Sequence, residues 1–140
     1  MNPNGILATF GPGDAVRRWN HDVGVAHDFL VGVGDQAFHS PGPGNVFQMA
    51  TVADVLANAR WVEVVDAAPS PQAAWARIKT AIGLIGTPWT FGDANCQDTI
   101  SYIVNGKPNS FQREGLIGLG VVVLFGIALL SRPQHLNRKQ

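Results

Sequence analysis

The chain has 140 residues, of which 46% are hydrophobic and 14% are charged, a length and composition that favour one domain with a well-filled core. Ten acidic side chains balance ten basic ones, so no global field attracts nucleic acid, and nucleic acid is not an expected partner. The single cysteine excludes an internal disulfide and fits a reducing compartment. The first residues lack the basic and then apolar segments of a secretory signal.

The first half of the chain predicts a strand followed by a hairpin. A Gly-Pro-Gly-Asp turn over 11–14 precedes a short strand that begins at Ala15. Apolar residues alternate over 28–38 and break at Gly34-Asp35, which predicts two paired strands with their turn at that dipeptide. The segment 40–45 (SPGPGN) has the composition of a loop.

The second half predicts helices and strands in alternation. We expect a short helix over 51–57, capped by its first threonine, and a half-buried strand over 61–66 (WVEVVD). A Ser-Pro pair then predicts a helix over 71–85, which glycine and proline end. We expect a strand over 89–91 (WTF) and a helix over 96–104, capped by the preceding asparagine and ended by an Asn-Gly pair.

A charge-free run over 115–130 (GLIGLGVVVLFGIALL) predicts a membrane segment. As a helix it would be roughly 24 Å long, close to the roughly 30 Å of a hydrocarbon core. The run has no polar face at helical spacing, which argues against a core helix. We therefore expect a domain over 1–112 and a C-terminal membrane anchor with a basic tail over 113–140. Its orientation stays open, because the basic tail favours the cytosol whereas a cytosolic domain with one span would put the tail on the far side.

Cys96 is the candidate nucleophile. At the first turn of a helix, unpaired backbone N–H groups and the positive end of the helix dipole favour a thiolate, so we expect the pKa of Cys96 to be lowered. The alternative is a small buried hydrophobe, the commoner role of a lone cysteine. A thiol nucleophile also needs a base, and the base needs a group that orients it.

Three histidines are candidates for those two roles. His27 opens the apolar strand and His39 ends the return strand, so the hairpin would bring them side by side as base and orienter. His21 is the alternative base. Each ring could equally be a surface or hydrogen-bonded structural residue. One cysteine and scattered histidines provide no close ligand pair, so we expect no metal and no cofactor.

Residues 95–112 (NCQDTISYIVNGKPNSFQ) resemble the NC-box of the lecithin:retinol acyltransferase-like phospholipase/acyltransferases, with Gly, Ser and Gln at the same offsets. The family's H-box is similar to His27, the Val-Gly-Asp of 33–35 and His39. This H-box/NC resemblance implies an α+β, permuted NlpC/papain-like fold. In that fold an antiparallel sheet carries the histidines and packs on helices, and a C-terminal hydrophobic membrane helix follows.

The resemblance also implies a reaction. His27 would deprotonate Cys96, His39 would orient His27, and the thiolate would attack a membrane lipid or phospholipid ester. Water or an acceptor amine or alcohol would then resolve the thioester. Asn95 and Gln97 are the supporting residues, and backbone N–H groups at the helix start would stabilise the oxyanion.

The chain departs from the family pattern in three places, and Gln97, Asp98 and Asp28 among them motivate a second hypothesis. Gln-Asp-Thr over 97–99 replaces the family's Glu-His-Phe, Asp28 replaces the aromatic neighbour of the first histidine, and Val-Gly-Asp is shifted by one residue within the histidine interval. The alternative is therefore a catalytically inactive, membrane-anchored adaptor in viral replication.

The viral setting comes from the same resemblance. Picornaviruses encode H-box/NC proteins as their 2A protein, and a chain ending in Gln140 resembles the product of a viral protease that cuts after glutamine. For a viral member we expect host-cell membranes, with the domain on the cytosolic side, and host or viral replication proteins as partners.

Overall fold

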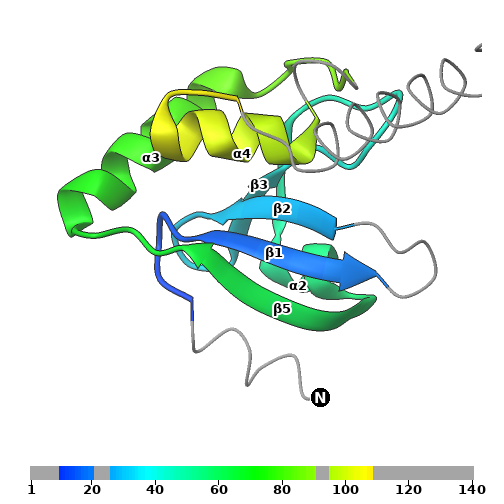
Figure 1. Cartoon of the computed structure of the whole chain (residues 1–140), viewed down its shortest axis with the longest axis horizontal. Helices are drawn as coiled ribbons and strands as arrows, with labels where there is room; N and C mark the ends of the chain where they lie inside the picture. The colour runs from blue at the N-terminus through cyan, green and yellow to red at the C-terminus, as the bar shows by residue number, and fades with distance from the viewer. Residues whose placement is uncertain (1–9, 21–25, 91–94, 109–140) are drawn as a thin grey trace, which may run out of the picture. The chain divides into compact units, whose positions relative to one another are not determined.

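The computed structural model describes residues 10–20, 26–90 and 95–108. These residues form an α+β fold in which helices cover both faces of a five-stranded antiparallel sheet (Figure 1). The elements are β1 (Ala15–Asn20), β2 (Ala26–Val31), β3 (Gln36–His39), β4 (Gln48–Thr51), α2 (Val52–Leu56), β5 (Ala59–Asp66), α3 (Pro71–Leu84) and α4 (Cys96–Asn105). The predicted α+β class and antiparallel sheet are confirmed.

The strands are ordered β4-β3-β2-β1-β5 in the sheet. The predicted hairpin is confirmed, because β2 pairs with β3 and Gly34 between them has the positive φ of 66° that a tight turn favours. Arg18 on β1 lies opposite His27 on β2, and His39 on β3 lies opposite Phe29. This register fixes which side chains share a face of the sheet.

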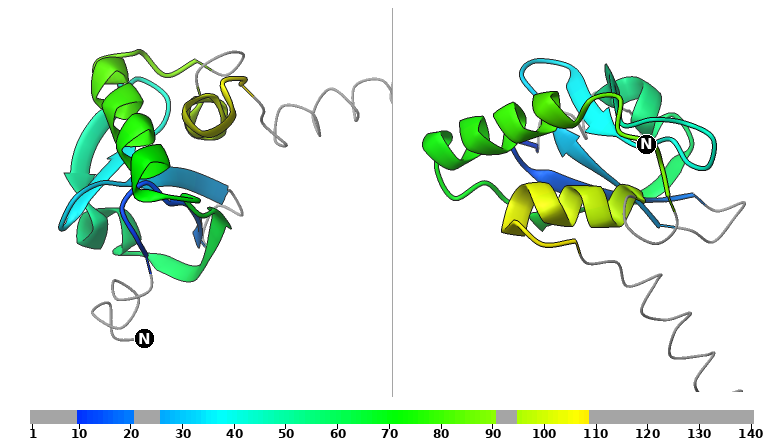
Figure 2. Two further views of the ribbon diagram at one scale, coloured as in Figure 1. Left: turned by 90° about the vertical axis from the view of Figure 1, so that its left-hand side faces the viewer. Right: turned by 90° about the horizontal axis from the view of Figure 1, so that it is seen from above.

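Strand alternation divides the core into two clusters, one on each face. On the first face, Leu30 of β2 and Phe38 of β3 pack with Ile78 of α3 and Ile100 of α4. On the second face, Phe29 of β2 packs with α2; the buried members there are Val16, Phe29, Val31, Ala37, Val52, Val55 and Leu56. The helices α3 and α4 lie side by side on the first face, and α2 lies on the second (Figures 1 and 2).

Helix starts follow the predicted capping chemistry. The Ser70 side chain accepts a hydrogen bond from the Ala73 amide over 3.1 Å, and Pro71 stands at the first helical position of α3. The Asn95 side chain accepts one from the Asp98 amide over 2.9 Å and so caps α4. Both predicted helices are confirmed, and their caps place Cys96 in the first turn of α4.

Two local predictions need correction. The strand β4 was not predicted, and it extends the sheet beyond β3. The strand predicted over 89–91 is wrong for its described residues 89 and 90. Only Pro88 bridges to Val46 there, through hydrogen bonds from Phe47 N to Thr87 O and from Trp89 N to Asn45 O.

The chain divides into two compact units, residues 1–110 and 111–140. All described residues belong to the first unit. No helix in the described ranges has the length and apolar character that crossing a bilayer requires. The membrane segment predicted over 115–130 lies outside the described residues.

Candidate functional site: a buried thiol and a pair of histidines

His27 and His39 contact each other as the hairpin predicts. His27 Nε2 lies 3.0 Å from His39 Nδ1, and the two rings meet edge to face with centroids 5.2 Å apart. They are diagonal neighbours on one face of the sheet, because His39 lies opposite Phe29, two residues beyond His27. Both side chains are buried. In this hydrogen bond one ring nitrogen donates and the other accepts.

The surroundings of the pair favour neutral rings. Burial, followed by the positive charge of Arg18 and the influence of His39, lowers the pKa of His27 to about 3. Burial and Arg18 lower the pKa of His39 to about 4. Arg18 lies directly across the sheet from His27. At neutral pH both rings are therefore neutral and weakly basic, and the pair holds no positive charge to stabilise a thiolate.

Cys96, at the start of α4, is a buried thiol with only 7% of its surface exposed. Burial raises its pKa, and the nearby Asp28 carboxylate raises it further, whereas backbone amides at Asp28, Gln97 and Cys96 act in the opposite direction. The predicted lowering of the Cys96 pKa is therefore wrong. Loss of water around the sulfur outweighs the stabilisation that the helix start offers. Cys96 is a neutral thiol at physiological pH.

The face of α4 that carries Cys96 determines its neighbours on the sheet. Cys96 stands four residues before Ile100 and so shares its side of the helix. Ile100 packs on the first face of the sheet, with Leu30. Asp28, two residues before Leu30 in β2, has the same alternation and also belongs to that face. The strand residue that α4 brings toward the thiol is therefore Asp28.

The histidines alternate the other way. His27 is two residues before Phe29, and His39 pairs with Phe29, which belongs to the second face with α2. Alternation thus directs both imidazoles away from the face that α4 covers. Across the described ranges no hydrogen bond joins the Cys96 thiol to either ring. The structure brings together the two predicted histidines, and it brings Asp28 to the thiol.

Asp28 is held by Arg17 of the neighbouring strand. Arg17 Nε donates to Asp28 Oδ1 over 2.7 Å and Arg17 Nη2 donates to Asp28 Oδ2 over 2.9 Å. The two residues lie opposite each other in register, and the carboxylate is buried. This two-pronged geometry is the strong form of the arginine–carboxylate pair. The pair fixes a carboxylate beside Cys96.

Asn95, Gln97 and His21 are the remaining candidate residues. Asn95 is the cap of α4, and Gln97 is buried in its first turn. His21 lies outside the described residues. Within the described ranges no three His, Cys, Asp or Glu side chains could hold a metal ion. His39 Nε2 and Ser40 Oγ are buried without a hydrogen-bond partner in the described part of the chain.

Sequence reasoning identified Asp28 only as a departure from the family pattern, and it did not place Asp28, Arg17 or Arg18 at the site. The signal that could have found them is the one-residue shift of Val-Gly-Asp relative to the histidines. A shift of one residue in a strand exchanges the side chains that face each side of the sheet. Every second residue counted back from Gly34 faces α4. This series includes Asp28 and leaves out His27.

No known family model matches this chain, and no curated protein matches it.

Proposed function

We propose that this chain is an H-box/NC-type domain of permuted NlpC/papain-like fold that acts as a membrane-tethered adaptor rather than as a thiol acyltransferase. The order of its parts supports the family, since strands carrying histidines precede a helix that begins at a cysteine. The NC-box-like residues 95–112 and the charge-free run over 115–130 add to that support. Viral replication at host-cell membranes is the setting that the resemblance favours.

The surroundings of the Cys96 thiol favour the adaptor over the enzyme. The Asp28 carboxylate lies near the Cys96 thiol and opposes formation of a thiolate, although the Arg17 and Arg18 guanidinium groups also interact with Cys96 and act in the opposite direction. The imidazoles that would serve as base follow the opposite alternation of β2 and β3. A general base must lie within hydrogen-bond reach of the proton that it removes. This arrangement suits a stable scaffold better than acyl transfer.

Thiol acyl transfer to or from membrane lipids is the second candidate. It is favoured by the backbone amides at Gln97 and Cys96, which lower the thiol pKa and could stabilise an oxyanion at the helix start. In this reaction His27 removes the Cys96 proton and His39 orients His27. The thiolate then attacks a phospholipid ester, the alcohol leaves, and water or an acceptor releases the acyl group.

An activity-based probe separates the two candidates. The full chain, Cys96→Ser and Cys96→Ala are incubated with phospholipid vesicles and with a thiol-reactive acyl probe. The adaptor predicts equal background labelling and no lipid hydrolysis in all three proteins. Labelling and hydrolysis that Cys96→Ala abolishes would establish the enzyme instead. Circular dichroism of each variant verifies that loss of signal is not loss of folding.

A further inference from the structure

The outer side of α3 exposes large apolar side chains that the fold leaves uncovered. Trp75 is 62% exposed, Ile82 is 56% exposed and Ile85, which follows the last helical residue, is 49% exposed. Trp75 and Ile82 stand seven residues apart and so share one side of the helix, which flanks the side that Ala74, Ile78 and Ala81 bury. We call Trp75, Ile82 and Ile85 the α3 stripe. Large apolar side chains that a fold leaves exposed close to one another are candidates for an interaction site.

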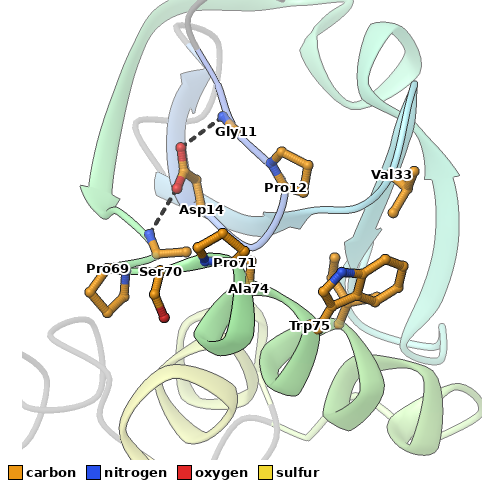
Figure 3. A pocket seen from close by; sticks show the side chains of 11 residues that line it. Gly11, Pro12, Asp14, Val33, Pro69, Ser70, Pro71, Ala74 and Trp75 are labelled. Carbon is orange, nitrogen blue, oxygen red and sulfur yellow. Dashed lines mark hydrogen bonds between the residues drawn. The ribbon is translucent and has the colours of Figure 1, made fainter.

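A groove of about 590 Å³ adjoins one end of the α3 stripe (Figure 3). Its walls are mostly apolar, and they include Pro12, Val33 and Trp75. The one carboxylate in its lining, Asp14, accepts hydrogen bonds of 2.8 Å from the Gly11 and Ala68 amides. Because Trp75 belongs to both features, the groove and the stripe form one continuous apolar surface.

The charged residues around this surface indicate which kind of partner it binds. Residues 67–90 contain no aspartate or glutamate and have two cations, Arg77 and Lys79. Arg77 points inward and donates to Asp66 over 2.6 Å, whereas Lys79 is exposed between Trp75 and Ile82. The surface thus combines tryptophan, aliphatic side chains and a lysine, and its one lining carboxylate, Asp14, is engaged by backbone amides; this combination matches the boundary between phospholipid headgroups and acyl chains.

The length of the chain keeps this surface near a membrane. Helix α4 ends at Asn105, and the predicted membrane segment begins at Gly115. Ten residues extend over at most about 35 Å, so a tethered domain samples the bilayer surface at high effective concentration. A weakly lipid-binding face is then sufficient for docking.

We propose that the α3 stripe and the adjoining groove dock on the surface of a phospholipid bilayer. Trp75 lies at the level of the headgroups, Lys79 faces lipid phosphates, and the groove accepts part of an acyl chain. The docking rests on the membrane tether of the proposed function and adds a second contact that orients the domain on the bilayer.

Tryptophan quenching tests the docking directly. The full chain is reconstituted in phosphatidylcholine–phosphatidylserine vesicles that contain lipid brominated near the headgroup. We expect quenching that Trp75→Phe removes and that Trp61→Phe keeps. Trp61 is a matched control, since it is 50% exposed but lies on β5. Quenching that persists in Trp75→Phe, or that is lost in Trp61→Phe, overturns the proposal.

A second pair of variants separates docking from tethering. Ile82→Asp should reduce Trp75 quenching while the chain still floats with the vesicles, and Val64→Asp on β5 should change neither. Flotation with no Trp75 quenching overturns docking and leaves the tether in place. Absence of flotation overturns the tether. Quenching of Trp75 by the added vesicles would then still support docking. Absence of both flotation and quenching overturns the tether and the docking together. Burial of Trp75 that depends on protein concentration without lipid shows a second copy as the occupant and also overturns it.

Discussion

His27 and Asp28 are adjacent in the sequence, but the pleat of β2 sends their side chains to opposite faces of the sheet. Asp28 takes the position toward α4 and is fixed there by Arg17. His27 takes the position toward α2 and bonds His39. The charge and chemistry around Cys96 therefore depend on a difference of one residue in a strand.

Burial of the histidine pair makes stability depend on pH. Their pKa values of about 3 and about 4 in the fold lie below the roughly 6.5 of an unfolded histidine. The buried neutral rings thus contribute their full share of the folding stability above about pH 6.5. This contribution is lost as the pH falls toward the pKa values of the folded state. Each ring contributes a slope of up to about 1.4 kcal/mol per pH unit.

Urea denaturation at several pH values checks this expectation. The free energy of unfolding of the wild type should fall more steeply between about pH 6.5 and pH 4 than that of a His27→Gln/His39→Gln variant. Parallel curves for the two proteins would mean that the rings are solvated and that the pair is not buried.

At the scale of elements, local signals predicted most of the secondary structure. Caps are such signals, because the Asn95 and Ser70 side chains bond amides only three residues away. Local signals did not predict β4, because its four residues (QMAT) alternate only weakly between apolar and polar. The strand is held by its pairing with β3. A strand stabilised by its neighbour has little signature of its own.

The cap of α4 can be tested by substitution. Asn95→Ala removes the acceptor for the Asp98 amide and should lower the free energy of unfolding by about 1 kcal/mol or somewhat more. Asn95→Ser keeps an acceptor and should restore most of that loss. Chemical denaturation of both variants measures the difference, and equal stabilities would show that the cap contributes nothing.

The contact between the first turn and α3 offers a sharper test. A Cβ at Gly13 would lie 2.5 Å from the Ala74 Cα, and its φ is 82°. Gly34 has a similar φ of 66° but open space around it. Gly34→Ala should therefore cost about 1 kcal/mol for conformation alone, and Gly13→Ala about 2–4 kcal/mol because α3 must also move. Equal losses in thermal denaturation would mean that α3 does not pack on this turn.

For the molecule as a whole, the sequence predicted which candidate residues the hairpin unites but not which face α4 covers. The proximity of His27 and His39 follows from one turn. The side on which Cys96 lies follows from the packing of Ile100 on Leu30, which are distant in the chain. The sign of the thiol pKa shift depends on the same packing, because burial is a property of the folded core.

The reactivity of Cys96 as a function of pH tests most directly whether an imidazole serves the thiol. The rate of alkylation by iodoacetamide is measured from about pH 6 to pH 10 on the wild type and on His27→Gln. We predict a single titration above the roughly 8.5 of an ordinary thiol, at the same pH in both proteins. A fast rate at neutral pH that His27→Gln abolishes would contradict the separation of the two groups across the sheet.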